Sequence, residues 1–403
     1  MKLAILINRA GPTNARLFRT LAEEPGVSLS VYYCSDVGVG KRDFDPGFNR
    51  AIDWGTDFLS GYRYRFLTNF LAFNKKNDAW LLNPGIVWKL FSGDFDCVIV
   101  YGWNSPTQWL AFAAAAVRGI RILVWGENPL NQELAKRITT MVLLKRFILR
   151  RLFKNVDAFL YIGKQNKDFY RFFGVPEGKL FFTPYATDNA RCEEAYRKLS
   201  PSRDRVRASL GISEDSIAIL FVGRLIHKKN PGDLLCAYEI LVRGVELSAP
   251  PPTLIFVGDG VLRGQLEKEM KNRRISNVHF KGFKGKEDLY PYFIAADVFV
   301  LPSGIGETWG LVVNEAMCFG LPVIVPDIVG CAADLVHNGE NGFTFSTGNV
   351  NALAEALKKL TENRELCRRF GERSRAIIAE YSQENDVKGI VGAVTNICKG
   401  MRS

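Results

Sequence analysis

Short runs of apolar, β-prone residues recur along the chain and are separated by segments of helical length. The runs are nearly continuous rather than alternating, which is typical of strands buried on both faces of a helix-covered parallel sheet. In the first half they are LAILIN (3–8), LSVYYC (29–34), CVIVYG (97–102), RILVWG (121–126), AFLYIG (158–163) and LFFTPYA (180–186). In the second half they are IAILFVG (217–223), TLIFVGDG (253–260), VHFKGF (278–283), VFVLPS (298–303), PVIVPD (322–327) and a weaker GFTFS (342–346).

A polar segment without a strand signal separates the two sets of strands. It covers 189–215, and we interpret it as a linker followed by the first helix of a second domain. The pattern therefore predicts an α/β protein of two doubly wound, Rossmann-like domains, 1–195 and 205–375, that face each other across a cleft. The remaining 376–403 is helical in pattern and could cross back to the first domain. Ligands of such sheets bind at the carboxyl ends of the strands, so we expect the chemistry there.

Length and composition agree with this organisation. The 403 residues exceed what a single core usually holds, and a hydrophobic content of 47% with 24% charged residues is ordinary for a globular protein. No apolar run approaches the ~18 residues of a membrane-spanning helix, and the N-terminal apolar stretch ends at Asn8, too early for a secretory signal. The 8 cysteines are scattered without a C-x-x-C pair, so we expect free thiols in a reducing cytoplasm.

The formal net charge of +11 favours an anionic partner. Nucleotides, phospholipid headgroups and nucleic acid all meet that condition, and the charge does not choose among them. Nucleic-acid binding would rest on net charge alone, so we do not expect it.

Basic residues follow the strand at 217–223 closely. Gly223 and Arg224 end it, and Lys228 and Lys229 come next. An arginine grips phosphate oxygens through two parallel hydrogen bonds, and a lysine adds a point charge. Fixed cations at a strand end are suited to a bound anion, although solvated charges at a strand end would look the same.

Two further glycine-containing stretches follow strands in the second half. VGDGVLRG (257–264) resembles a dinucleotide fingerprint, but Arg263 stands in place of the third glycine, so we interpret it as a tight turn. The stretch 280–293 contains Phe283 and Lys284 in a glycine-rich loop that could surround a nucleobase. An ordinary connecting loop explains its composition equally well.

The stretch GETWGLVVNEAMCFG (306–320) carries two acids eight positions apart, Glu307 and Glu315. A helix is predicted to begin near Gly310 or Leu311, and its free amides would bind a diphosphate. Glu307 would lie in the loop outside the helix and Glu315 about one turn inside it. Because carboxylates accept hydrogen bonds from hydroxyl groups, the arrangement suits a diphosphate flanked by polyols. Alternatively, Glu307 only caps the helix and Glu315 is a structural acid.

Three stretches in this order and spacing, GRLIHKKNPGDLLCAYEIL, VGDGVLRGQLE and GETWGLVVNEAMCFGLPVIVPDIVG, resemble glycosyltransferase family 4. The resemblance is strong over 205–375 and weaker in the first half, where GYRYRFLTN, YGWN and WGENP are similar to some bacterial members. It implies the GT-B fold and the transfer of a sugar from a nucleotide donor with retention of configuration.

The resemblance also implies roles for the residues that match the family's motifs. Glu307 would contact the transferred sugar, Glu315 the ribose hydroxyls, and Arg224 with Lys229 the diphosphate. The predicted catalytic residues are therefore Glu307, Arg224 and Lys229. The other predicted donor-binding residues are Gly223, Phe283, Lys284, Thr308, Trp309, Gly310, Leu311 and Glu315.

Members of the family need no metal and no cofactor, and the donor, here expected to be a UDP- or GDP-linked sugar, is a substrate. Charge grows on the leaving diphosphate as the glycosidic bond breaks, and two cations with a helix N-terminus can stabilise it. The D-x-D pattern of metal-dependent transferases occurs at 43–45 and 94–96. Asp94 and Asp96 precede a strand rather than end it, so we interpret them as loop charges.

The first domain departs from the family pattern. Its first strand is followed by NRAGPTN, with Gly11 in place of a two-glycine turn, and all three histidines lie in the second half. The polar candidates for the acceptor side are therefore Gly11, Asn104 and Glu127. Glu127 is our choice for a contact with the acceptor, although an acid at a helix N-terminus explains it nearly as well.

A basic stretch, KRITTMVLLKRFILRRLFKN (136–155), contains seven basic residues and no acid. As a helix it places most of its apolar residues on one side, but Leu143 and Phe147 fall among the basic ones. An amphipathic helix packed on its sheet explains the first feature, whereas a membrane-surface helix explains both. We therefore expect contact with an anionic membrane.

The sequence as a whole predicts a retaining hexosyltransferase that uses a hydroxyl acceptor in polysaccharide or glycolipid synthesis. We expect it in the cytoplasm, peripheral on the inner face of the membrane. A nucleotide-sugar epimerase of the same architecture stays open, as does a non-catalytic sugar- or lipid-binding scaffold. The histidine-free first domain argues against the epimerase, and the intact acid pair with Arg224 and Lys229 argues against the scaffold.

Overall fold

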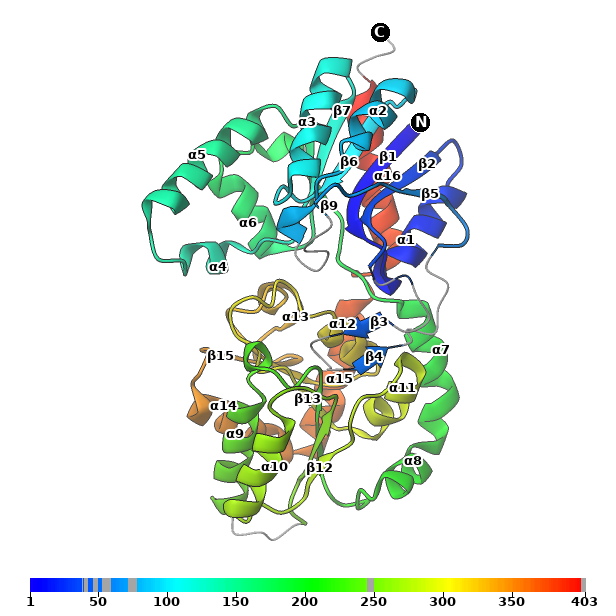
Figure 1. The fold of residues 1–403 in the computed structure, drawn as a ribbon. Helices are drawn as coiled ribbons and strands as arrows, with labels where there is room; N and C mark the ends of the chain where they lie inside the picture. Colours follow the sequence, from blue (N-terminus) through cyan, green and yellow to red (C-terminus); the bar gives the residue numbers. More distant parts are fainter. Residues whose placement is uncertain are drawn as a thin grey trace. The chain divides into compact units, whose positions relative to one another are not determined.

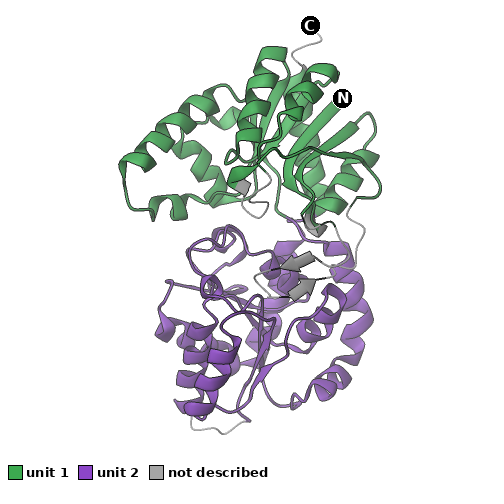
Figure 2. Cartoon of the chain, in the orientation of Figure 1, with its two compact units in different colours: residues 1–43, 53–185, 383–403 green, residues 44–52, 186–382 purple. Residues whose placement is uncertain are grey.

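The chain forms two compact units in the computed structural model (Figure 2). The structure describes residues 1–37, 39, 43–45, 50–52, 59–71, 78–244 and 250–399. Unit 1 consists of residues 1–43, 53–185 and 383–403, and unit 2 of residues 44–52 and 186–382. The chain passes from unit 1 to unit 2 between Tyr185 and Ala186, upstream of the expected boundary at 195, because the helix that begins at Asn189 is grouped with unit 2.

Unit 1 is built on a seven-stranded sheet in the order β5-β2-β1-β6-β7-β8-β9. Every pairing in it is parallel, with Ile5 of β1 paired to Val31 of β2 and to Ile99 of β6. The strands are β1 (Lys2–Arg9), β2 (Ser28–Ser35), β5 (Arg63–Phe66), β6 (Cys97–Tyr101), β7 (Arg121–Trp125), β8 (Ala158–Tyr161) and β9 (Leu180–Phe182). A separate two-stranded sheet pairs β3 (Asp43–Asp45) with β4 (Arg50–Ile52).

Helices cover both faces of the sheet of unit 1 (Figure 1). They are α1 (Pro12–Glu23), α2 (Gly85–Ser92), α3 (Pro106–Arg118), α4 (Leu130–Leu134), α5 (Thr140–Lys154), α6 (Lys164–Phe172) and α16 (Gln383–Lys399), with short 3-10 turns η2 (Asp78–Trp80) and η3 (Glu177–Lys179). The C-terminal α16 contacts α1, β8 and β9. A Cβ on Gly389 would lie 2.1 Å from the carbonyl oxygen of Phe182, so α16 approaches the sheet too closely for a side chain there.

The helix α3 shows how local sequence sets these boundaries. Pro106 occupies its first turn, and the amide of Ser105 donates to the side-chain oxygen of Gln108 at 2.7 Å. Gly119 ends the helix in the left-handed conformation, with φ 74°. The buried face of α3 joins β6, β7 and parts of α5 and α6 in the core of unit 1.

Unit 2 repeats the design with six parallel strands in the order β12-β11-β10-β13-β14-β15. The strands are β10 (Ala218–Val222), β11 (Thr253–Val257), β12 (Val278–Phe280), β13 (Val298–Val300), β14 (Val323–Pro326) and β15 (Gly342–Phe345). The four strands β10, β11, β13 and β14 are buried along their whole length, as their unbroken apolar runs predicted.

Figure 1 shows α9, α10 and α14 on one side of this sheet and α7, α8 and α11 on the other. The helices of unit 2 are α7 (Asn189–Leu199), α8 (Arg203–Leu210), α9 (Pro231–Arg243), α10 (Arg263–Asn272), α11 (Lys286–Ala295), α12 (Leu311–Cys318), α13 (Ala332–Leu335), α14 (Val350–Thr361) and α15 (Arg364–Ile378), with η4 (Ser200–Ser202) and η5 (His227–Lys229). The segment 189–215, interpreted above as a linker and one helix, therefore contains two helices, α7 and α8.

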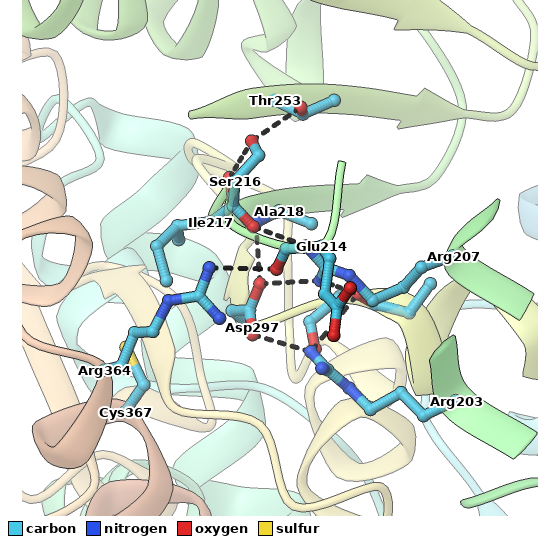
Figure 3. Close-up of polar contacts among 12 residues, drawn as sticks. Arg203, Arg207, Glu214, Ser216, Ile217, Ala218, Thr253, Asp297, Arg364 and Cys367 are labelled. Carbon is cyan, nitrogen blue, oxygen red and sulfur yellow. Dashed lines mark hydrogen bonds and ion pairs between the residues drawn. The ribbon is translucent and has the colours of Figure 1, made fainter. Parts of the chain in front are cut away.

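The amino ends of β10 and β13 are joined by a charge cluster (Figure 3). Arg207, only 1% exposed, donates to Asp297 and to the carbonyl oxygens of Ala295, Ser213 and Ser216. Asp297 also accepts from the amide of Ala218, at 2.7 Å, and from Arg203, at 2.6 Å. These bonds tie α8 to the edge of the sheet that lies opposite the carboxyl ends of the strands.

The predicted fold class is confirmed, because the chain forms two α/β units, each with a parallel sheet. The strand β5 was not predicted. No helix in the described part of the chain combines the length and the apolar character needed to cross a membrane.

Candidate active site

The carboxyl ends of β10 and β11 are in direct contact through glycines. Gly223 donates its amide to Val257, at 2.9 Å, and Gly258 adopts φ +137°. A Cβ on Gly258 would lie 1.9 Å from the carbonyl oxygen of Gly223, so no other residue fits there. The tight turn predicted at 257–264 is confirmed, and Arg263 in it pairs with Asp259 of the same turn and Glu267 of α10.

Two lysines and one acid meet beside this turn. Lys229 Nζ lies 2.5 Å from Glu307 Oε2, and Lys228 Nζ lies 3.7 Å from the same oxygen. The side chains of Lys229 and Glu307 are only 14% and 11% exposed. Burial lowers the pKa of Lys229, while Glu307 acts in the opposite direction and Lys228 and Arg224 add to the lowering. Lys229 and Glu307 were predicted to bind the same ligand, and the structure places them in contact although they are 78 positions apart.

Positive charge gathers around the carboxylate of Glu307. Lys228 and Lys229 share this carboxylate, and Arg224 lies close enough to contribute to the lowered pKa of Lys229. These side chains lie at the carboxyl end of a parallel sheet, where ligands of such folds bind. The arrangement thus favours an anionic ligand.

The loop that carries Glu307 is held by hydrogen bonds to a second loop. Gly330 donates to the carbonyl oxygen of Glu307, at 3.2 Å, and Cys331 donates to that of Trp309, also at 3.2 Å. A Cβ on Gly330 would lie 1.6 Å from the carbonyl oxygen of Thr308, so the two backbones are in close contact. These contacts fix the path of the backbone from Glu307 to the start of α12.

The helix α12 begins at Leu311, as the sequence predicted, with Gly310 before it in the left-handed conformation. The first amides of a helix have no acceptor within it, and they carry the positive end of the helix dipole. Val313 already donates to Gly310, at 2.8 Å. The amides of Leu311 and Val312 are therefore the donors that this turn of helix could offer to a phosphate.

The side chain of Trp309 belongs to the core rather than to a ligand-binding surface. It is 2% exposed, its indole nitrogen donates to Asn314 at 2.9 Å, and its ring lies 5.8 Å from that of Tyr381. Only the backbone of Trp309 can serve the donor role predicted for it. Asn314 therefore positions the loop from inside α12.

Glu315 lies one turn inside α12. Burial raises the pKa of its carboxyl group, an effect that Lys286 and the hydroxyl of Thr187 oppose. Thr187 Oγ1 donates to Glu315 Oε1 at 3.4 Å. Sequence reasoning missed Thr187 and Lys286, because neither belongs to a motif and both come from segments far from α12 along the chain.

The loop with Phe283 and Lys284 follows β12 and adjoins the same turn. Gly258 donates to the carbonyl oxygen of Gly282, at 2.8 Å, and Gly282 adopts φ +69°. Lys284 Nζ lies 6.0 Å from the centre of the Tyr292 ring. The structure thus connects this loop to the end of β11, and through Gly258 to Gly223.

The three acceptor-side candidates follow three neighbouring strands of unit 1. Gly11 precedes α1 after β1, Asn104 is exposed after β6, and Glu127 follows β7. Glu127 hydrogen-bonds Tyr185, and burial raises the pKa of that tyrosine well above its ordinary value, with Glu127 contributing. Asp386 of α16, which sequence reasoning missed, is buried in the same unit, and burial raises its pKa well above the usual range.

The acids of the second D-x-D stretch serve the structure. Asp94 forms an ion pair with Lys2 at 2.5 Å, and Asp96 accepts from the amide of Lys2 at 2.7 Å, so both lie before β6 as loop charges. The other D-x-D, Asp43 to Asp45, forms β3. Among the residues that the structure describes, no three His, Cys, Asp or Glu side chains are grouped so that they could hold a metal ion. The 8 cysteines are free, as expected.

Two parallel-sheet α/β units, the second with a cationic strand edge and a glycine loop at a helix start, define the GT-B class of glycosyltransferase folds. Comparison with solved structures agrees. The protein HepE from Anabaena, in complex with UDP, has a TM-score of 0.73 at 17% identity, over 98% of this chain and 100% of that one. The sucrose-phosphate synthase from Thermosynechococcus elongatus has a TM-score of 0.71 at 19% identity, over 99% of this chain and 100% of the other.

Residues 202–377 match the family model of glycosyl transferases group 1. A capsular polysaccharide biosynthesis glycosyltransferase, CapM of Staphylococcus aureus, is 27% identical over 86% of this chain and 84% of its own length. The putative glycosyltransferase EpsD of Bacillus subtilis is 29% identical over 48% of this chain and 50% of its own. Of six further curated relatives the chain spans less than half the length. The chain is therefore similar to glycosyl transferases group 1 over 202–377 and to named glycosyltransferases over part or most of its length.

Proposed function

We propose that the protein is a retaining glycosyltransferase that moves a sugar from a nucleoside-diphosphate donor to a hydroxyl acceptor. One observation carries the proposal: Glu307 lies between Lys228 and Lys229, immediately before the start of α12, with Glu315 one turn inside that helix. Along the chain, Glu307, the helix amides and Glu315 therefore come in the same order as the sugar, the diphosphate and the ribose of a nucleotide sugar.

In the proposed complex, Arg224, Lys229 and the backbone from Thr308 to Leu311 bind the diphosphate. Glu315 accepts from the ribose hydroxyls, and Glu307 accepts from hydroxyls of the transferred sugar. The backbone around Phe283 and Lys284, beside Gly258, contacts the base. The carboxylate of Glu307 would exchange its bond to Lys229 for bonds to the sugar, which frees the ammonium group for the phosphate.

The leaving nucleoside diphosphate gains negative charge as the glycosidic bond breaks. Preorganised cations and helix amides stabilise such charge without reorganisation, and interactions of this kind are each worth about 10²–10³ in rate. In this mechanism a donor phosphate oxygen takes the acceptor's proton, and no metal or cofactor is required. Two carboxylates flanking one bond, as in glycoside hydrolases, are not needed.

The nature of the donor and acceptor is part of the proposal. We propose a UDP- or GDP-linked hexose, and the solved structures of HepE with UDP and with UDP-glucose support the first of these. CapM, named for capsular polysaccharide biosynthesis, supports a role in the synthesis of a polysaccharide or glycolipid. Gly11, Asn104 and Glu127 would contribute to the acceptor side. We further propose that the enzyme acts in the cytoplasm at the inner face of the membrane.

A nucleotide screen followed by product analysis tests this function. Thermal shifts with UDP, GDP and ADP identify the base, and nuclear magnetic resonance of the product made from the preferred α-linked donor gives the anomeric configuration. We expect an α-linked product and unchanged turnover in EDTA. A β-linked product, or donor that is converted to a second nucleotide sugar without an acceptor, would contradict the proposal, and the latter outcome would indicate an epimerase.

A further inference from the structure

The helix α5 of unit 1 exposes an unusual amount of apolar surface. Of its fifteen residues only Leu149 and Phe153 are buried, whereas α3, of similar length, buries six. Thr139 caps α5 by accepting from the amide of Val142 at 3.3 Å, so the helix is well formed. The exposed apolar residues along it and just before it are Leu134 (56%), Ile138 (67%), Met141 (81%), Leu143 (54%), Leu144 (57%), Phe147 (57%) and Ile148 (40%).

The same helix carries basic residues that the protein does not neutralise. The carboxylate of Glu133, in α4, forms ion pairs with Lys136 at 2.5 Å and with Arg146 at 3.2 Å. In the described part of the chain, no carboxylate lies within ion-pair distance of Arg150, Arg151 or Lys154. Three uncompensated cations therefore stand at the C-terminal end of α5, next to the exposed apolar residues.

These three residues surround a cavity between α5 and the end of α6, with a volume of about 370 Å³. That volume lies in the range of sites for small ligands. Its lining combines cations with aromatic rings: Phe147, Arg150, Arg151, Phe153, Lys154, Phe172, Phe173 and Gly174. The guanidinium groups are stacked on these rings, Arg150 at 5.8 Å from the centre of Phe172 and Arg151 at 5.4 Å from that of Phe147.

We propose that this cavity binds the phosphate headgroup of an anionic phospholipid while α5 lies on the membrane surface. The arginines and the lysine that line the cavity can bind a phosphate group. Its phenylalanine rings can contact the apolar part of an amphiphile. The exposed residues from Leu134 to Ile148 enter the boundary between headgroups and acyl chains, as interfacial helices do.

The apolar residues decide between this occupant and a soluble polyanion. Nucleic acid or free phosphate would satisfy Arg150, Arg151 and Lys154, but would leave Met141 and Phe147 in water. A membrane surface satisfies both sets at once. The inference does not depend on the transfer reaction, because the residues that carry it lie in or directly beside α4, α5 and α6, and none of them belongs to the candidate active site.

Flotation with vesicles tests the site. The full chain is mixed at 0.1 M salt with vesicles of phosphatidylcholine alone or with 30% phosphatidylglycerol. We expect binding to the anionic vesicles only. The triple variant R150A/R151A/K154A should bind them roughly 100-fold more weakly, since each basic residue near an anionic surface contributes about fivefold. The matched control R197A/K198A/R205A removes the same charges from exposed positions of unit 2 and should bind like the parent.

A second variant separates the membrane from other occupants. M141S/L143S/F147S keeps every charge and should lose about tenfold or more in vesicle binding, whereas V117S/I240S, which alters exposed residues elsewhere, should not. Either of two vesicle results would overturn the proposal: equal binding of the parent and R150A/R151A/K154A to anionic vesicles, or vesicle binding that M141S/L143S/F147S leaves unchanged. Self-association of the lipid-free protein that M141S/L143S/F147S abolishes would also overturn it, and would identify the face as a contact between copies of the chain.

Discussion

The two edges of the sheet in unit 2 each hold buried arginines or lysines with an acid, but the two clusters differ in how their charges are satisfied. At the amino edge, Arg207 and Asp297 bond to each other and to backbone groups of several segments (Figure 3). At the carboxyl edge, Lys228 and Lys229 share the one carboxylate of Glu307. A buried ion pair alone does not indicate a function. Two lysines that share one carboxylate beside a helix start favour an anionic ligand.

The largest expected effect is on nucleotide binding at the carboxyl edge. The double variant R224A/K229A should weaken nucleoside diphosphate binding by about 3–6 kcal/mol, because each charge-assisted bond to phosphate contributes about 1.5–3 kcal/mol. Calorimetry with the preferred nucleotide measures the loss. R197A/K198A, on the exposed side of α7, is the control and should bind normally. Unchanged affinity in R224A/K229A would remove both residues from the diphosphate site.

At the amino edge the effect should fall on stability instead. Replacing Asp297 by alanine leaves Arg207 buried without its acid, and loss of one partner of a buried pair costs about 3–5 kcal/mol of unfolding free energy. Denaturant titration measures this loss, and the turnover of the folded fraction should stay at the parent value. If D297A were stable but inactive, the contrast between the two edges would be wrong.

Glu307 should show the opposite behaviour. E307Q should lower kcat by about 10²–10³, the effect of removing one preorganised polar group from a transition state. The affinity for the nucleotide alone should change little, because Lys229 then becomes free to bind phosphate. E340Q, which alters an exposed ion pair with Arg373, is the control for a lost carboxylate. Parent-like turnover in E307Q would exclude Glu307 from the reaction.

The smallest effect should appear as a pH dependence. The lowered pKa of Lys229 means that its ammonium group loses its proton below the ordinary value of 10.5 as the pH rises. Nucleotide affinity should therefore fall in alkaline solution before ordinary lysines titrate. Calorimetry at several alkaline pH values measures this fall. In K229R the guanidinium keeps its charge, so the fall should disappear. An equal fall in the parent and in K229R would assign it to another group.

Strands with continuous apolar runs could be predicted from the sequence, and those elements are confirmed in both units. The strand β5, RYRF, could not, because it lies at the edge of its sheet with every residue exposed and so alternates basic and aromatic side chains. For a related reason, one helix was predicted over 189–215, where the structure has two, α7 and α8. They are strongly polar, and what holds α8 is the buried Arg207, whose partners are Ala295 at the end of α11, Asp297 just before β13 and the segment before β10.

Some residues of the candidate site could also be predicted from the sequence, and others could not. Its motif residues could be named from the sequence because a glycine loop and a helix start have local signatures. That Lys229 meets Glu307 follows from the parallel order of β10 and β13, which brings together the ends of strands far apart along the chain. Thr187, beside Glu315, and Asp386 have no local signature, since each is placed by packing of a distant segment.

The return of α16 to unit 1 has a consequence for biosynthesis. Residues 1–185 leave the ribosome before α16, but unit 1 needs α16 as well, since its Gly389 lies against Phe182 of the edge strand β9. The residues of unit 2 have all emerged once residue 382 is out. Unit 1 can therefore be finished only after unit 2 has been synthesised, and until α16 arrives the apolar face that it covers stays open to chaperones.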